Sequence, residues 1–183
     1  MSIAGDDLPV QVTHIPGITR VRYTNSTKQD VRLVTAGEDH LVRLLPSEPT
    51  ATDVIPLVME DATQNISWIE ANNKYLVTAS EDGAVRLYQH ALQSEDDPQK
   101  ATSCIRIVRR EVLPVRCVSL ERATESPRAA ICSDELIIRV ASVEDPRQIT
   151  LLTGHTRGVR AASWSPILPL LVSCGSDGDI RVW

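Results

Sequence analysis

The sequence repeats one unit of thirteen residues, which reads Leu33-Val-Thr-Ala-Gly-Glu-Asp-His-Leu-Val-Arg-Leu-Leu45 in its first copy and Leu76-Val-Thr-Ala-Ser-Glu-Asp-Gly-Ala-Val-Arg-Leu-Tyr88 in its second. Two less similar copies occupy residues 129–141 and 171–183. The seventh residue of every copy is acidic, and successive acidic positions are 43, 53 and 42 residues apart: Asp39, Asp82, Glu135 and Asp177. Periods of about 40–45 residues are typical of the four-stranded blades of propeller proteins.

Each copy of the unit predicts a β-hairpin. Its first half is β-favouring, its centre reads Glu-Asp-Gly or Ser-Asp-Gly in the second and last copies, and its second half alternates apolar residues with arginine. Asp and Gly suit tight turns, because Asp hydrogen-bonds to nearby backbone and Gly accepts positive φ angles. We expect the repeated arginine to cover an apolar face with its stem and to reach solvent with its guanidinium, although a binding stripe is an alternative. These arginines are Arg43, Arg86, Arg139 and Arg181.

Further β-favouring runs flank the hairpins, and no helical periodicity of useful length is present. One run precedes each hairpin, at residues 18–23, 66–70, 115–120 and 159–164, and another follows the first three, at about 54–58, 104–108 and 149–152. Four antiparallel strands per repeat predict an all-β propeller. We therefore interpret residues 1–183 as one partial propeller with blades at about 18–58, 66–108, 115–152 and 159–183, the last lacking its fourth strand; residues 10–12 are a candidate leftover outer strand.

Composition narrows the class of protein. Of the 183 residues, 42% are hydrophobic and 23% are charged, which excludes a disordered chain, a collagen and a coiled coil. The net charge of −5 argues against a broad electropositive surface for duplex DNA or anionic lipid. It is compatible with a local basic strip for DNA contact, for which the alternative is a solvated outer strand and loop. The candidate strip consists of Arg106, Arg109, Arg110 and Arg116.

The cysteines and the hydrophobic runs point to an intracellular protein. Cys104, Cys117, Cys132 and Cys174 are too widely spaced to assemble a zinc site, so we expect small buried side chains in a reducing compartment and no bound metal. The first residues are acidic and contain no apolar segment typical of a secretory signal. No apolar run is long enough to span a bilayer, so we expect no membrane association.

The last repeat carries a motif that resembles WD-repeat proteins. Gly154-His155 is followed by Ser173, Asp177 and Trp183, in the order Gly-His, Ser, Asp, Trp of that family. The resemblance implies a structural tetrad in which the imidazole, hydroxyl, carboxylate and indole N–H form one hydrogen-bonded chain. Partial tetrads are expected in the first two repeats. Their residues are His14, Thr35 and Asp39, and then Thr78 and Asp82.

The order and turn context of His155, Ser173 and Asp177 fit this structural tetrad better than a hydrolase triad. The sequence also lacks a G-x-S-x-G motif and a glycine-rich phosphate loop, so we expect no catalytic residue and no cofactor. Rings of the family have about seven blades, and we therefore expect the chain to be a piece of a larger propeller. An enzyme with a metal in the central channel is a further, less favoured hypothesis.

A narrower resemblance covers most of the chain. The segments 34–39, 76–82, 130–140, 151–160 and 174–183 are similar to the N-terminal propeller of the replisome adaptor family that includes the chromosome transmission fidelity, minichromosome loss and acidic nucleoplasmic DNA-binding proteins. This resemblance implies a nuclear scaffold that links the replicative helicase to DNA polymerase α on chromatin and supports sister-chromatid cohesion. No partner-binding residue can be transferred from it. The alternative is an unrelated WD-repeat adaptor in ubiquitin ligation, trafficking or RNA processing.

Overall fold

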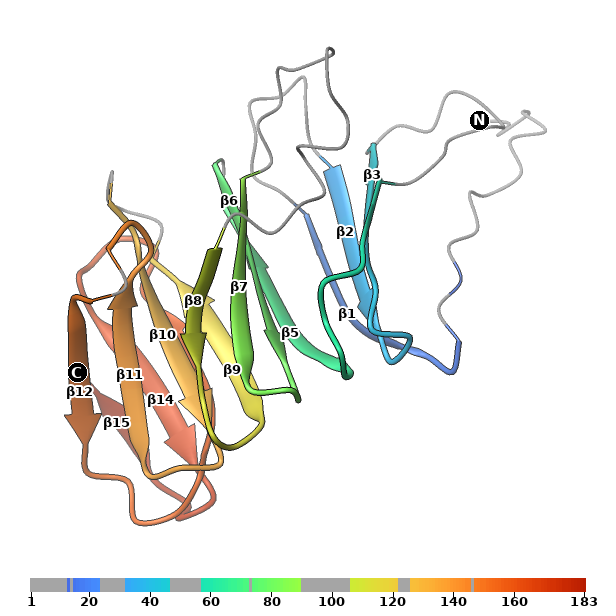
Figure 1. The fold of residues 1–183 in the computed structure, drawn as a ribbon. Coiled ribbons are helices and arrows are strands. Elements are labelled where there is room, and N and C mark those ends of the chain that lie inside the picture. Colours follow the sequence, from blue (N-terminus) through green and yellow to red (C-terminus); the bar gives the residue numbers. More distant parts are fainter. Residues whose placement is uncertain are drawn as a thin grey trace, which may run out of the picture.

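A computed structural model describes residues 13, 15–23, 32–46, 57–72, 74–89, 106–121, 126–145 and 147–183. Within these ranges the chain forms four antiparallel sheets, each built from consecutive strands (Figure 1). The all-β propeller arrangement predicted from the repeat is confirmed. No helix in the described ranges is long and apolar enough to cross a membrane.

Each sheet starts with the strand that lies on the inside of the arc. The first sheet contains β1 (Ile18–Tyr23), β2 (Arg32–Gly37), β3 (Val42–Pro46) and β4 (Leu57–Met59). The second contains β5 (Ile66–Ala71), β6 (Tyr75–Ser80), β7 (Ala84–Gln89) and β8 (Arg106–Arg110). The third contains β9 (Val115–Leu120), β10 (Arg128–Ser133), β11 (Ile137–Ser142) and β12 (Ile149–Thr153). The fourth has β13 (Val159–Trp164), β14 (Leu171–Gly175) and β15 (Ile180–Val182).

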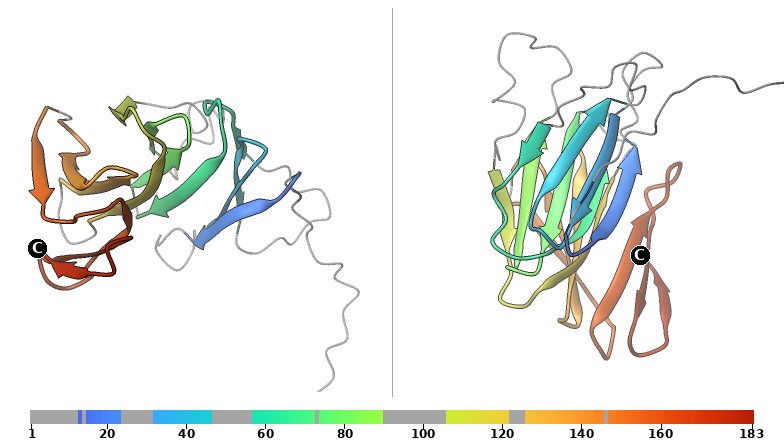
Figure 2. Two further views of the ribbon diagram at one scale, coloured as in Figure 1. Left: turned by 90° about the horizontal axis from the view of Figure 1, so that it is seen from below. Right: turned by 90° about the vertical axis from the view of Figure 1, so that its right-hand side faces the viewer.

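The sheets stand side by side like blades around an arc, and β1, β5, β9 and β13 are neighbours in turn along its inner side (Figure 2). The hairpin turns at 38–41, 81–83, 134–136 and 176–179 all lie at the lower end of the blades in Figure 1. The connections between blades, at 60–65, 111–114 and 154–158, reach the same end. We call this end the turn end.

Within the described residues, three apolar cores hold the blades together, one between each pair of neighbours. Alternate residues of a strand point to opposite faces, so Leu76 of β6 packs toward the first blade while Val77 packs toward the third. Both side chains are fully buried. A strand in a middle blade is therefore buried on both faces, and this explains why β6 reads as an almost continuous apolar run.

The outer face of the fourth blade carries exposed apolar side chains. Val172, Ile180 and Val182 are 40%, 75% and 64% exposed, and Cys174 is exposed on the same face. The expectation that cysteines within strand-like runs are buried is correct for Cys117 and Cys132 but wrong for Cys174. Its strand alternates so that Ser173 points to the third blade and Cys174 points away from it.

The repeated arginines differ from expectation, because their guanidinium groups do not simply extend into solvent. Arg86 contacts Asp82 at 2.6 Å, and equivalent contacts join Arg43 to Asp39 and Arg139 to Glu135. The turn brings the seventh and eleventh residues of the repeat together on one side of the hairpin. The arginine therefore neutralises the acidic residue of its own turn.

Candidate interaction site at the turn end

The last blade holds a continuous hydrogen-bonded chain of four side chains. Trp183 Nε1 donates to Ser173 Oγ at 2.9 Å, and the Ser173 hydroxyl lies 2.9 Å from Nε2 of His155. The other ring nitrogen, Nδ1, lies 2.8 Å from Oδ2 of Asp177. Because a carboxylate only accepts, Nδ1 carries the proton, and Nε2 accepts from the serine hydroxyl. Each polar atom of this chain has a partner.

Asp177 anchors the chain to the backbone of two segments. The amide of Thr156 donates to Oδ2 at 2.9 Å, and the amide of Asp179 donates to Oδ1 at 3.2 Å. Burial by itself would raise the pKa of Asp177, but these amides and His155 lower it from 3.8 to about 2. The tetrad therefore joins the 154–158 connection to the last hairpin and fixes the turn end of the fourth blade.

This geometry does not present a nucleophile to a substrate. Ser173 is 2% exposed, and its hydroxyl is held between His155 and Trp183. A serine that attacks a substrate has to be accessible to it. Among the described residues, no group of three or more His, Cys, Asp or Glu side chains is placed to hold a metal ion.

The second blade has the same turn carboxylate without a histidine. Asp82 accepts from both terminal nitrogens of Arg86, at 3.1 and 2.6 Å, and from the amide of Ala84 and the amide and hydroxyl of Thr63. Burial would raise the pKa of Asp82, but these donors hold it well below its usual value. Thr78 stands where the last blade has Ser173, and its buried hydroxyl makes no hydrogen bond within the described residues.

The first blade has the carboxylate of Asp39 in contact with Arg43 at 2.6 Å, and the buried Thr35 of β2 pairs with Arg43 in the strand register. His14 lies outside the described residues. The possible outer strand at 10–12 lies outside them as well.

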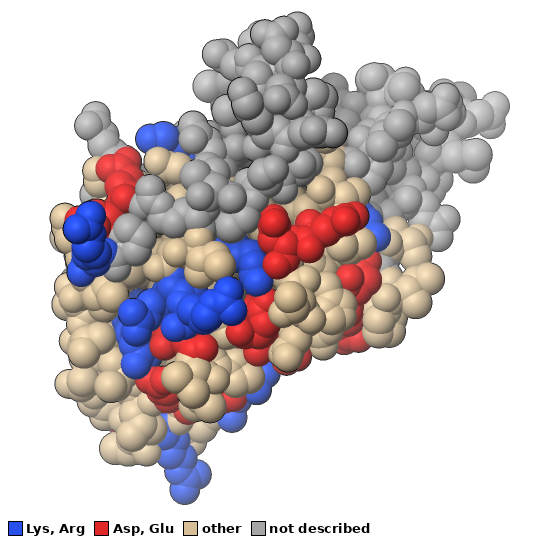
Figure 3. Space-filling view, viewed as in Figure 1, with Lys and Arg blue, Asp and Glu red and all other residues tan. Residues whose placement is uncertain are grey.

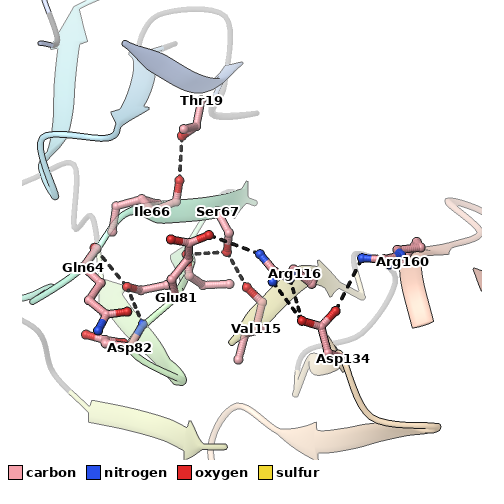
Figure 4. Close-up of polar contacts among 12 residues, drawn as sticks. Thr19, Gln64, Ile66, Ser67, Glu81, Asp82, Val115, Arg116, Asp134 and Arg160 are labelled. Carbon is pink, nitrogen blue, oxygen red and sulfur yellow. Dashed lines mark hydrogen bonds and ion pairs between the residues drawn. The ribbon is translucent and has the colours of Figure 1, made fainter. Parts of the chain in front are cut away.

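A row of bulged residues runs along the turn end of the four innermost strands. The strand pairing slips by one residue near the start of β1, β5, β9 and β13, and this leaves Thr19, Ser67, Arg116 and Arg160 without a ladder partner. Bulges re-aim the side chain of the extra residue. Figure 4 shows these four side chains at the junctions between neighbouring blades.

In the first two blades the bulged residue ties the blade to the next one. Thr19 donates to the carbonyl of Ile66 at 2.6 Å, and Ser67 donates to the carbonyl of Val115 at 2.5 Å (Figure 4). Both acceptors are the residues just before the next bulge. The hydroxyl groups of Thr19 and Ser67 therefore form hydrogen bonds that link neighbouring blades.

In the third blade an arginine bridges two turns. Arg116 donates to Asp134 of its own blade at 2.8 and 3.0 Å, and to Glu81 of the second blade at 3.1 Å. The hydrogen bonds to Asp134 raise the pKa of Arg116, and the same contact lowers the pKa of Asp134. Sequence reasoning did not find this row, although a small hydroxyl residue or arginine at the second position of each innermost strand was visible.

The arginines of the candidate basic strip lie on two different strands and do not form one strip. Arg109 and Arg110 lie on the outermost strand β8, where Figure 3 shows a patch of basic side chains bordered by acidic ones. Nε of Arg109 donates to Glu111 at 3.0 Å. Arg116 lies on the innermost strand β9 and is held by Glu81 and Asp134. The side chain of Arg106 lies outside the described part.

Comparison with known proteins agrees with the geometry. The family model described as "WD domain, G-beta repeat" matches residues 61–89 and 146–183, which contain the hairpins of the second and fourth blades. These two segments are similar to WD40 repeats. The WD40 β-propeller domain of Doa1 superposes with a TM-score of 0.71 at 13% identity, covering 93% of this chain and 51% of that domain. That likeness supports the fold.

Two curated proteins are similar to this chain in sequence. WD repeat and HMG-box DNA-binding protein 1 of Xenopus laevis is 28% identical over 151 residues, which is 82% of this chain and 12% of that protein. Peroxisome biogenesis protein 7 of Arabidopsis thaliana is 29% identical over 77 residues, which is 42% of this chain and 24% of that protein. The chain thus spans a minor part of the length of either relative.

Proposed function

We propose that the chain is a non-enzymatic protein-interaction scaffold and forms part of a replisome and chromatin adaptor. One observation carries this proposal: the similarity to WD repeat and HMG-box DNA-binding protein 1 extends over 82% of the chain. The resemblance noted from the sequence leads to the same family. In this role the protein resides in the nucleus, links the replicative helicase to DNA polymerase α, and supports sister-chromatid cohesion.

The turn end supports a scaffold role physically. It collects side chains from four blades on one surface, and it lies at the strand ends rather than on the sheet faces. A scaffold needs a rigid surface of this kind, and the bulged residues provide rigidity because they cross-link neighbouring blades. The fold alone does not determine a function.

Binding of purified replication proteins tests the proposal. The chain, immobilised at one terminus, is expected to retain purified DNA polymerase α or replicative helicase subunits, and Arg160→Glu, which changes an exposed arginine of the turn end, is expected to weaken that retention. Arg147→Glu, which changes an exposed arginine at the opposite end of the third blade, is the matched control. Absence of retention, together with exclusion of the tagged protein from chromatin, would reject the replisome role.

An adaptor outside the replisome is the alternative. The similarity to peroxisome biogenesis protein 7 over 42% of the chain favours it, and ubiquitin ligation, trafficking and RNA processing are other settings for such an adaptor. Direct DNA contact by Arg106, Arg109, Arg110 and Arg116 has less support, because carboxylates already engage Arg109 and Arg116. A gel shift that weakens steeply with salt would support DNA contact.

A further inference from the structure

We propose that the turn end of the third and fourth blades docks an extended segment of a partner protein that combines acidic and apolar side chains. The proposal rests on the scaffold function and names the chemistry of its partner. The docking patch consists of Arg157, Arg160, Leu136, Leu113 and Val112. All five lie in the turns and connections of this end or on the bulge beside them.

The cationic half of the patch has unused hydrogen-bonding capacity. Arg160 donates from Nε to Ser176 at 2.6 Å and contacts Asp134 only at 3.4 Å, and its side chain is 58% exposed (Figure 4). Arg157 is exposed and has no ion pair or hydrogen bond within the described residues. A guanidinium carries five N–H donors in a planar fork that matches a carboxylate. These two arginines can therefore accept a carboxylate from outside the chain.

The nearby carboxylates are engaged elsewhere. Asp134 receives two short hydrogen bonds from Arg116, and Asp179 receives one from Arg181 at 2.9 Å. Asp177 is held by the tetrad, and Glu135 contacts Arg139 at 2.7 Å. Asp134 also contacts Arg160, but this contact of 3.4 Å is longer than the two that Asp134 makes with Arg116, so an incoming carboxylate can compete for Arg160.

Of the apolar half, Leu136 lies beside Arg157, and Leu113 and Val112 lie in the connection that packs on the turn of the second blade. Leu136 at the tip of the third hairpin is 48% exposed, and Leu113 and Val112 before β9 are 39% and 94% exposed. The 154–158 connection packs directly on the third hairpin, because the amide of Val159 donates to the carbonyl of Glu135 at 3.2 Å. A Cβ on Gly158 would approach the Asp134 carbonyl to 3.0 Å. This contact places Arg157 next to the turn that carries Leu136.

The patch also fits a protein partner because of its position. It lies at the strand ends, so blades packed on the open face of β14 and β15 would not cover it. The combination of cations and exposed apolar groups matches a segment that carries both acidic and leucine-like residues. Electrostatic attraction would guide the encounter, and desolvation of the apolar side chains would hold the complex together.

Fluorescence anisotropy with a short labelled peptide of Glu, Asp and Leu tests the proposal on the chain itself. We expect saturable binding that weakens with added salt, and the double variant Arg157→Ala/Arg160→Ala is expected to bind at least about tenfold more weakly. Leu136→Ser is expected to weaken binding with an unchanged salt dependence. Arg147→Ala, which removes a 95% exposed arginine at the other end of the blade, is the matched control and is expected to bind normally.

Charge reversal excludes misfolding as the cause of a loss. Arg157→Glu/Arg160→Glu is expected to reject the acidic peptide and to gain binding of a peptide of Lys and Leu. Absence of binding by the wild-type chain would overturn the proposal, as would equal binding by the alanine double variant. Binding of a duplex oligonucleotide in place of the peptide, lost in the same double variant, would overturn it in favour of a nucleic-acid surface. These assays contain no replication protein. Peptide binding can therefore be observed even if the chain does not retain replication proteins, and the chain can retain replication proteins even if it does not bind the peptide.

Discussion

Nδ1 of His155 lies 2.8 Å from Oδ2 of Asp177, and this contact replaces the one that arginine makes in the other blades. Asp39, Asp82 and Glu135 each pair with the arginine four residues later. In the fourth blade the equivalent Arg181 turns to Asp179 instead, at 2.9 Å. The turn carboxylate is thus satisfied in every blade, either by a histidine from the preceding connection or by an arginine of its own hairpin.

Replacing Asp177 by alanine tests this role of the carboxylate. The Asp177→Ala variant leaves Nδ1 of His155 and the amides of Thr156 and Asp179 without an acceptor inside the fourth blade. We expect the melting temperature of the chain to fall by about 4–8 °C, measured by circular dichroism. Asp179→Ala removes a carboxylate that is 55% exposed and is the control with little change expected. Equal melting of Asp177→Ala and the wild type would contradict the structural role of the tetrad.

The carboxylate of Asp177 also makes the free energy of unfolding depend on pH. Because the folded state lowers the pKa of Asp177 from 3.8 to about 2, its stabilising effect is complete above about pH 4 and is lost as the pH falls toward 2. Urea unfolding between pH 2 and 5 should show this loss in the wild type. Asp177→Asn cannot titrate, so its free energy of unfolding should vary less over that interval. Parallel curves for the two proteins would refute this assignment.

The Arg86–Asp82 ion pair of the second blade is buried. Breaking it should lower the free energy of unfolding more than breaking the exposed Arg181–Asp179 pair of the fourth blade. The side chains of Arg86 and Asp82 are 4% and 7% exposed. Arg86→Met leaves the Asp82 carboxylate with the donors of Thr63 and Ala84 only, and we expect a loss of roughly 3 kcal/mol in the free energy of unfolding. The double variant Arg86→Met/Asp82→Asn should recover part of the free energy of unfolding that Arg86→Met loses, because the unpaired charge is removed.

Arg181→Met provides the matched comparison for Arg86→Met. It changes the same position of the repeat, but its partner Asp179 is exposed and the pair is solvated, so we expect a loss below about 1 kcal/mol. Urea unfolding measures both variants. If both lose equally, burial of the ion pair is not the reason for the effect.

The local part of the fold could be predicted from the sequence. Apolar residues at every second position and the Asp-Gly turn at 82–83 predict a hairpin on their own, because strand alternation and turn geometry depend on neighbouring residues. The repeat then gives the number of blades. The hydrogen-bonded chain from His155 to Trp183 was expected because the motif resembles that of WD-repeat proteins.

Contacts between blades could not be predicted in this way. The bridge from Arg116 to Glu81 and Asp134 depends on a bulge and on how two sheets pack, and neither is encoded in a local pattern. The pairing of Arg86 with Asp82 was missed for a different reason. The guanidinium of an arginine often extends to solvent while its stem covers an apolar face, and the sequence does not show that the turn places the acidic side chain next to the guanidinium.

Cysteine labelling tests the open face of the fourth blade. Cys174 is exposed there, whereas Cys117 and Cys132 are fully buried, and a hydrogen bond with Cys117 together with burial raises the pKa of Cys132. In a Cys104→Ser background, which removes the cysteine outside the described residues, a maleimide should modify one thiol rapidly. The other two should react only after denaturation, because both side chains are buried and the reagent cannot reach them. Cys174→Ser should abolish the rapid phase. Rapid modification of two or three thiols in the folded chain would show that the third and fourth blades do not pack as described.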